Sequence, residues 1–255
     1  MKRIAFLVQL PKYVSPGQRF RIEQFEPVLL EKGFKLDTYP FINHATYKII
    51  YKEGNNFRKA LGVLQGFLKR LFFLFKAHRY HYIFLQREAA PLGPPVFEWI
   101  LAKVLKKKLI LDFDDAIWIP NTSSGNKLAH YLKCNWKVKY LCKWSYKVSV
   151  GNEYLFKYAA QYNENVVLIP TCVDTENRYN ETKVHSENDI IIGWTGSHST
   201  LPYLDMLLPV LKRLEEKFHF QFIVVCDKEP AFKLKSLKFL TWNKKSEISD
   251  LLKID

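Results

Sequence analysis

The sequence predicts an α/β protein with two Rossmann-like domains, the second of them incomplete. Short apolar runs typical of buried strands alternate with amphipathic, helix-like segments along almost the whole chain. Such alternation requires parallel sheets. It is interrupted once, by a polar segment over residues 171–188. The 255 residues are enough for two domains that each bury a core.

The first predicted domain covers residues 1–170. It opens with a strand in KRIAFLVQ and a helix through RFRIEQFEPVLLEKGF that ends at Gly33. The later strands are expected in FKLDTYPF, YHYIFLQ, KLILDF, KVSVGN and VVLIP. The later helices are expected in residues 57–77, PPVFEWILAKVLKK, NKLAHYLKCNWKVKYLC and EYLFKYAAQY. About six strands in this order are consistent with a doubly wound sheet.

The polar residues 171–188 lack an apolar period and are interpreted as a linker between domains. The second domain, residues 189–255, then resumes the alternation. Its strands are expected in DIIIGWTG, HFQFIVVCD and LKFLTW, and its helices in STLPYLDMLLPVLKRLEEKF and SEISDLLK. Three strands are half of a usual Rossmann-like sheet, so this domain is expected to be incomplete.

The composition favours anionic partners and a cytoplasmic protein. Thirty-nine Lys and Arg against twenty-five Asp and Glu give a formal net charge of +14, which suits nucleotides, nucleic acid or acidic lipid headgroups. The four cysteines show no CxxC pair and no metal-ligand spacing, so we interpret them as reduced core thiols. The apolar run IAFLV after Arg3 is too short for a signal peptide or a membrane span.

Three carboxylates, Asp112, Asp114 and Asp115, follow the predicted strand KLILDF. Ligands of open parallel sheets bind beyond the carboxyl ends of the strands. Any one Asp is explained equally well as a helix cap or a turn residue. Three within four residues repel one another unless a cation, a ligand hydroxyl or a metal compensates, so the cluster indicates a functional site. Asp112 and Asp114 also match the short acidic motif with which GT-A glycosyltransferases hold a divalent metal.

Five segments together resemble a GT-B glycosyltransferase of the group-1, family-4-like class. They are SPGQRFRIEQFEPVLLEKGF, LILDFDDAIW, VGNEYLFKYA, VVLIPTCVD and IIIGWTGSHSTLPYL. The resemblance implies two Rossmann-like domains facing a cleft, with the acceptor on the first and the nucleotide-sugar donor mainly on the second. It also implies sugar transfer with retained anomeric configuration, no catalytic metal, and no cofactor besides the donor substrate. Basic side chains and backbone N–H groups would stabilise the leaving diphosphate.

The resemblance assigns roles by motif. Asp114 and Asp115 are expected to be catalytic, on the acceptor side. The expected substrate-binding residues are Gly17, Gln18, Arg21, Asp112, Asn152, Gly193, Thr195, Gly196 and Ser197. The last four of these would form the first donor-side loop. His198, in the same loop, is interpreted as an ordinary polar surface residue.

Two parts of the family pattern have no counterpart here. The basic residues expected after the first donor-side strand are missing, since GWTGSHST contains only His198, and so is a pair of glutamates. The family carries two glutamates with seven residues between them, and the sugar and ribose lie between that pair. The spacing occurs once, from Glu23 to Glu31, on the first predicted helix, where we interpret it as helical surface charge. Three alternatives stay open: an N-terminal fragment, a split enzyme that needs a C-terminal partner chain, or an inactive remnant.

Residues 54–87 contain no acidic residue, and their basic residues alternate with apolar ones. The basic residues are Arg58, Lys59, Lys69, Arg70, Lys76, Arg79 and Arg87. A core helix with a solvated basic face would explain this pattern. The missing counter-charges favour an anionic membrane surface instead, at the inner face of the plasma membrane. The expected acceptor is a saccharide or a lipid-linked sugar in cell-surface polysaccharide synthesis.

A non-catalytic basic α/β module that binds nucleic acid or a partner protein is the alternative function. The aromatic residues in KCNWKVKYLCKWSYK suit stacking on bases. However, Trp136, Tyr140 and Trp144 recur at i, i+4 and i+8, which defines one helix face that could equally be core. No nucleic acid partner is therefore expected.

Overall fold

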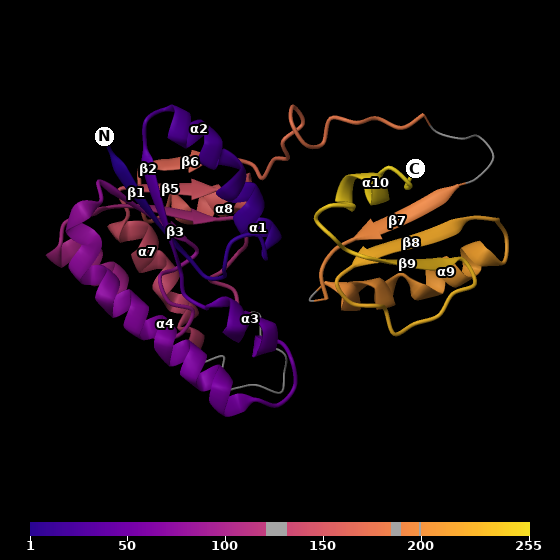
Figure 1. Ribbon diagram of the computed structural model, residues 1–255, viewed down its shortest axis with the longest axis horizontal. Helices are drawn as coiled ribbons and strands as arrows, with labels where there is room; N and C mark the ends of the chain where they lie inside the picture. Colours follow the sequence, from indigo (N-terminus) through magenta and orange to yellow (C-terminus); the bar gives the residue numbers. More distant parts are fainter. Residues whose placement is uncertain (121–131, 185–189, 199) are drawn as a thin grey trace. The chain divides into compact units, whose positions relative to one another are not determined.

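The computed structural model describes residues 1–120, 132–184, 190–198 and 200–255. The chain divides into two compact units, Met1–Cys172 and Val173–Asp255 (Figure 1). This division falls two residues after the end of the first domain in the sequence analysis.

The first unit is built on a six-stranded parallel sheet with the order β2-β1-β3-β4-β5-β6. Its strands are β1 (Arg3–Val8), β2 (Lys35–Pro40), β3 (Tyr82–Gln86), β4 (Lys108–Phe113), β5 (Lys147–Val150) and β6 (Val166–Leu168). Each strand lies within one of the predicted apolar runs. The predicted class, an α/β fold with a parallel sheet, is confirmed.

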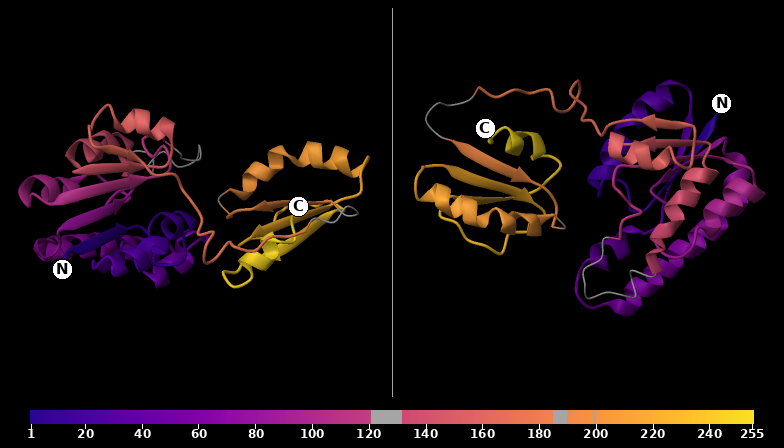
Figure 2. Two further views of the ribbon diagram at one scale, coloured as in Figure 1. Left: turned by 90° about the horizontal axis from the view of Figure 1, so that it is seen from above. Right: turned by 180° about the vertical axis from the view of Figure 1, so that it is seen from behind.

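Helices cover both faces of this sheet (Figure 2). The helices are α1 (Pro16–Arg21), α2 (Glu26–Glu31), α3 (His44–Ile50), α4 (Asn56–Lys76), α5 (Val96–Trp99), α7 (Val138–Trp144) and α8 (Glu153–Ala159). Shorter turns are η1 (Glu23–Phe25), η2 (Ala77–Arg79), η3 (Ile100–Val104, a π-helix) and η4 (Asn135–Lys137). The chain reverses direction across the sheet after β2. Helices α4, α7 and α8 and the turn η3 lie together in the main core, whereas Ile22, directly after α1, and Leu29 of α2 pack on the other face.

Two predicted helices of this unit are interrupted. The helix expected through residues 19–34 is split into α1, η1 and α2, because Ile22 leaves helical geometry at φ −132° and ψ −60°. Pro27, which lacks an amide hydrogen, then stands in the first turn of α2. The helix expected through residues 126–142 lies partly outside the described residues. Its described part breaks at Cys134, whose φ of 50° is left-handed.

The second unit contains a three-stranded parallel sheet, β7-β8-β9. Its elements are β7 (Ile191–Thr195), η5 (Leu201–Met206), α9 (Leu208–Glu215), β8 (Gln221–Cys226), β9 (Leu237–Thr241) and α10 (Glu247–Leu251). The single helix predicted after β7 is divided into η5 and α9, with Pro209 in the first turn of α9. Leu204, Phe222 and Val224 contribute to a core of its own.

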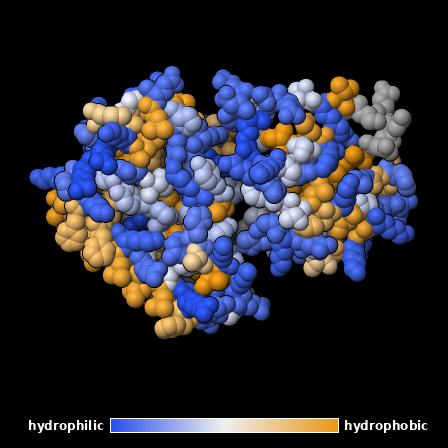
Figure 3. All heavy atoms as spheres, viewed as in Figure 1, coloured by the Kyte–Doolittle hydropathy of each residue, from blue (hydrophilic) through white to orange (hydrophobic). Residues whose placement is uncertain are grey.

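Apolar side chains also gather on the surface of the first unit along α4 (Figure 3). None of the helices in the described part of the chain is both long enough and apolar enough to cross a bilayer.

Candidate active site

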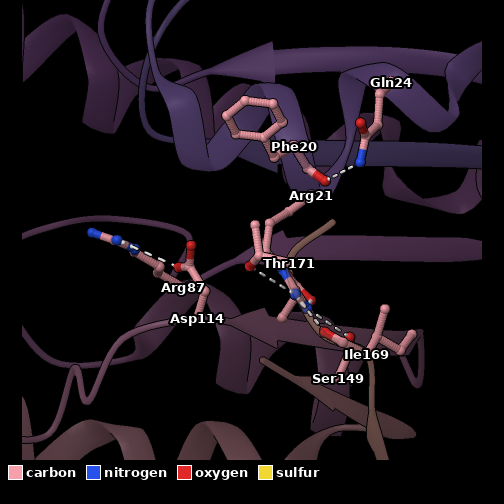
Figure 4. A network of polar contacts seen from close by, with 9 residues as sticks. Phe20, Arg21, Gln24, Arg87, Asp114, Ser149, Ile169 and Thr171 are labelled. Atoms are coloured by element: carbon pink, nitrogen blue, oxygen red, sulfur yellow. Dashed lines mark hydrogen bonds and ion pairs between the residues drawn. The ribbon is translucent and has the colours of Figure 1, made fainter. Parts of the chain in front are cut away.

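Arg21 ties together the carboxyl ends of β4, β5 and β6. Its Nε donates to Asp112 Oδ2 at 2.9 Å, and its Nη2 donates to Asp112 Oδ1 at 2.5 Å and to Ser149 Oγ at 3.2 Å. Its Nη1 donates to the carbonyl oxygen of Ile169 at 2.6 Å and to Thr171 Oγ1 at 3.4 Å (Figure 4). The guanidinium has five N–H groups, so these five contacts use its donor capacity fully.

The Arg21–Asp112 pair is buried, with exposed fractions of 8% and 2%. Burial alone lowers the pKa of Arg21, but the hydrogen bonds and charge of Asp112 raise it above its ordinary value. The two residues were expected to bind substrate, yet here their charged atoms contact each other. This geometry favours a positioning role, in which the pair holds three strand ends in register.

Asp114 and Asp115 are more exposed and share a second arginine, Arg87. Its Nη2 lies 3.5 Å from Asp114 Oδ1 and contacts Asp115 Oδ2. The exposed side-chain fractions are 21% for Asp114, 63% for Asp115 and 40% for Arg87. The backbone of Arg87 has a φ of 66°, a left-handed conformation that non-glycine residues adopt mostly at constrained sites.

Two arginines therefore compensate the three carboxylates whose mutual repulsion indicated a functional site. Arg21 neutralises Asp112, and Arg87 serves both Asp114 and Asp115. Across residues 1–120, 132–184, 190–198 and 200–255, no group of three or more His, Cys, Asp or Glu is placed to hold a metal ion. The exposed group keeps a net charge of −1, which suits a ligand that donates hydroxyl hydrogens.

Two glycines allow neighbouring loops to approach Asp114. A Cβ atom at Gly17, in the first turn of α1, would lie 3.3 Å from Asp114 Oδ2. A Cβ atom at Gly151, just after β5, would lie 3.4 Å from Asp114 Cα. The structure thus brings Gly17, Gly151 and the acidic turn together, although they are far apart in sequence.

The other two site residues predicted in this unit have local structural partners. Asn152 caps α8, since its Oδ1 accepts from the amide of Leu155 at 3.0 Å. Gln18 is 1% exposed and donates to Glu23 Oε1 at 2.8 Å. Its own Oε1 is buried and has no hydrogen-bond partner among the described residues. Gln18 therefore retains an unused acceptor beside the site.

In the second unit, the predicted donor-side loop begins later than expected. Gly193 lies inside β7, where a Cβ atom would come within 2.2 Å of Ile254 Cδ1. Its placement in the loop was therefore wrong, because close packing in the strand accounts for this glycine. Thr195 ends β7, and the loop proper starts at Gly196, whose amide donates to the carbonyl of Val225 at 3.1 Å.

The sequence analysis missed a pairing between His198 and Asp227. The amide of His198 donates to Asp227 Oδ1 at 2.6 Å, and its Nδ1 lies 2.7 Å from Asp227 Oδ2. Burial alone raises the pKa of Asp227, but the hydrogen bonds from His198 lower it below the ordinary value. Both residues follow the carboxyl ends of adjacent strands, β7 and β8. The position of Asp227 directly after an apolar strand was a signal that could have revealed it.

The sequence matches no protein-family model and no curated protein. Among solved structures, the chain is similar to a glycosyltransferase from Rickettsia africae ESF-5, with a TM-score of 0.60 and 15% identity over 100% of this chain and 72% of that one. The glycotransferase of kitacinnamycin gives a TM-score of 0.49 and 14% identity over 97% of this chain and 73% of that one. The fold of this chain is that of a GT-B-type glycosyltransferase.

Proposed function

We propose that this protein transfers a sugar, without a metal and with retained configuration, from a nucleotide-sugar donor to a saccharide or lipid-linked acceptor in cell-surface polysaccharide synthesis. The glycosyltransferase fold supports sugar transfer in general. The observation that carries the finer proposal is the exposed Asp114–Asp115–Arg87 group at the carboxyl edge of the first sheet. Ligands of open parallel sheets bind at that edge.

In this proposal the first unit binds the acceptor. Asp114 and Asp115 accept hydrogen bonds from acceptor hydroxyls, and Arg87 holds the two carboxylates in place. Gly17 and Gly151 keep the space around Asp114 free of side chains. The buried Arg21–Asp112 pair keeps the strand ends in register and does not itself touch substrate.

The second unit binds the donor diphosphate in this proposal. Its candidate contacts are the backbone N–H groups that start at Gly196 and the imidazole of His198, which Asp227 orients through Nδ1. The order β7-β8-β9 contains no reversal, whereas nucleotides bind where strand order reverses. We therefore propose that tight donor binding needs further strands, supplied by a longer form of the protein or by a partner chain. Sub-micromolar nucleotide-sugar binding by residues 1–255 alone would contradict this requirement.

Kinetics of the intact transferase, including the chain that completes the second unit, test the assignment. Transfer should persist in excess EDTA. Asp114→Asn and Asp115→Asn should each lower kcat about tenfold or more with little change in donor affinity. Glu31→Gln, on the exposed surface of α2, is the matched control and should leave transfer unchanged. A strict requirement for Mn²⁺, together with lost donor binding in Asp114→Asn, would instead support a GT-A-like metal site.

The alternative function, a basic module that binds nucleic acid, is tested on the same protein. Calorimetry with UDP- and GDP-sugars and with a single-stranded oligonucleotide at moderate salt separates the two functions. The proposal requires preference for the nucleotide sugar. Preference for the oligonucleotide would replace it.

A further inference from the structure

Helix α4 exposes its apolar stripe to solvent. Seven large apolar side chains, each at least 42% exposed, lie along it at spacings of three or four residues, apart from the adjacent Leu71 and Phe72. They are Phe57, Leu61, Leu64, Leu68, Leu71, Phe72 and Phe75. The buried stripe contains Gly62, Gly66, Arg70 and Phe73. Val63, Phe67 and Leu74 also pack against the core, so α4 is apolar on both sides, whereas an ordinary amphipathic helix is apolar only toward the core.

The contacts of the buried stripe do not require the outward apolar residues. Gly66 allows close packing, because a Cβ atom there would lie 2.6 Å from Phe41 Cε1. Arg70 donates to the carbonyl oxygens of Val8, Tyr39 and Ala89, at 2.8, 2.9 and 2.5 Å. Burial lowers the pKa of Arg70 to about 10, so it remains cationic at neutral pH. Arg70 therefore serves the fold and does not belong to the exposed basic surface predicted from sequence.

Helix α5 packs against both α4 and α7. Phe67 of α4 contacts Phe97 of α5, with ring centroids 6.2 Å apart. Between α5 and α7 lies an apolar groove of about 240 Å³. Its lining is Pro94, Pro95, Val96, Trp99, Trp136, Tyr140 and Trp144. Trp99 and Trp136 are 47% and 53% exposed, so this aromatic row borders a surface groove and is not closed core.

The charge of this three-helix surface has one sign. The only acidic residue in α4, α5, η3, η4 and α7 is Glu98, which is 2% exposed and accepts from the amide of Ala89. Exposed basic residues are present on α4, on η3 directly after α5, and on α7. They are Arg58, Lys69, Lys76, Lys103, Lys139 and Lys143. A second copy would present the same positive charge to this surface, whereas an anionic bilayer is complementary to it.

We propose that the outward faces of α4, α5 and α7 form one membrane-docking surface for an anionic bilayer. The Leu and Phe side chains of α4 enter the acyl boundary, and Lys and Arg pair with headgroup phosphates. Trp99, Trp136, Tyr140 and Trp144 lie at the depth where aromatic residues are enriched at membrane interfaces. This inference rests on the proposed function for its purpose, because it would bring the first unit to a lipid-linked acceptor.

Flotation of the whole chain with vesicles tests the docking surface without any sugar-transfer readout. Binding is expected to vesicles that contain phosphatidylglycerol and not to pure phosphatidylcholine, and it should weaken as salt rises. The variant Leu64→Ser/Leu68→Ser/Phe72→Ser should lower partitioning at least tenfold. The variant Trp99→Ala/Trp136→Ala should lower it severalfold. The matched control, Val28→Ser/Leu30→Ser, changes two exposed apolar residues of α2 and should bind like the wild type.

Circular dichroism and thermal unfolding exclude misfolded variants. Loss of flotation is attributed to the docking surface only in variants that retain the wild-type melting curve. Wild-type protein that does not float at low salt would overturn the inference. So would concentration-dependent dimerisation that the α4 variant abolishes, since a second copy would then cover the surface. Flotation that persists although the kinetic test of the transferase shows no sugar transfer would leave the docking surface in place and remove the proposed function.

Discussion

Two groups of arginine and carboxylate side chains lie at the same edge of the first sheet. They differ in burial, and burial determines how much each group contributes to stability. Arg21 and Asp112 are almost fully buried, whereas Arg87, Asp114 and Asp115 are partly exposed. Removing one partner from a buried ion pair leaves an uncompensated charge and costs about 3–5 kcal/mol. Exposed pairs contribute about 0–1 kcal/mol, because water screens them. The first group is thus expected to contribute more to stability than the second.

The substitution Asp112→Asn should therefore lower the free energy of unfolding by about 3 kcal/mol, measured by urea denaturation. The amide cannot match the bidentate charge on Arg21, which loses its carboxylate partner. The matched control is Asp115→Asn in the same turn, which should change stability by less than about 1 kcal/mol. Equal unfolding midpoints for the two variants would contradict the assignment.

The His198–Asp227 pair makes a prediction about pH. The pKa of Asp227 is lower in the folded state than in the unfolded state. Its carboxylate therefore stabilises the fold fully above the unfolded pKa of about 3.9. This contribution to stability is lost as the pH falls through the folded pKa. In His198→Ala the pKa of Asp227 should rise, because one of its hydrogen bonds is lost. Carbon-13 NMR titration of the carboxyl group measures this. The control His219→Ala, at an exposed site, should leave the titration unchanged.

At the scale of elements, the residues that pack the long helix α4 against the core differ from those that form its exposed apolar stripe. Its packing against the core depends on two glycines, a buried arginine and Phe73, while seven other large apolar side chains face outward. Helix propensity alone would favour alanine over glycine by about 1 kcal/mol. Close packing opposes that gain wherever a methyl group has no room.

We expect Gly66→Ala to destabilise the protein by roughly 1 kcal/mol or more, despite the better helix former. The new methyl group would overlap the ring of Phe41, which is completely buried and cannot move aside. Leu64→Ala, on the outward stripe, should change the free energy of unfolding by no more than about 0.5 kcal/mol. A stabilised Gly66→Ala variant would show that α4 docks less tightly than described.

At the scale of the whole molecule, each core cluster lies within one unit. Three clusters belong to Met1–Cys172 and one to Val173–Asp255. The last residues of the first unit are also bound to it, since Arg21 reaches Thr171 and Gln24 Nε2 donates to the carbonyl of Cys172 at 3.0 Å. The first unit thus has its own core, and we expect it to fold independently.

A protein comprising residues 1–172 should fold alone and unfold in one cooperative thermal transition. A shorter protein, residues 1–165, is the matched comparison. It lacks β6 and the carbonyl of Ile169 that accepts from Arg21, so its melting temperature should be clearly lower or its transition lost. Identical melting curves for the two proteins would show that β6 and the Arg21 contacts contribute little.

The sequence by itself determined the order of strands and helices, the parallel sheets and the position of the acidic turn at a strand end. These features can be predicted because they depend on the spacing of apolar residues within each short segment. That spacing is two residues in a strand and three or four in a helix. Helix ends were predicted less well. Ile22 and Cys134 interrupt helices at positions that no local pattern marked. The residue roles carried over from the family resemblance stay predictions.

Three features were decided only by the tertiary structure. They are the pairing of charged side chains with one another inside the protein, the face of α4 that is buried, and the contact between His198 and Asp227. Arg21 and Asp112 are 91 residues apart, and His198 and Asp227 are 29 apart. Such pairs depend on which strands become neighbours in the sheet. The side of α4 that is buried depends likewise on Gly66 fitting against Phe41. Local sequence patterns carry no information on these distant partners, because strand order and close packing arise only when the whole unit assembles.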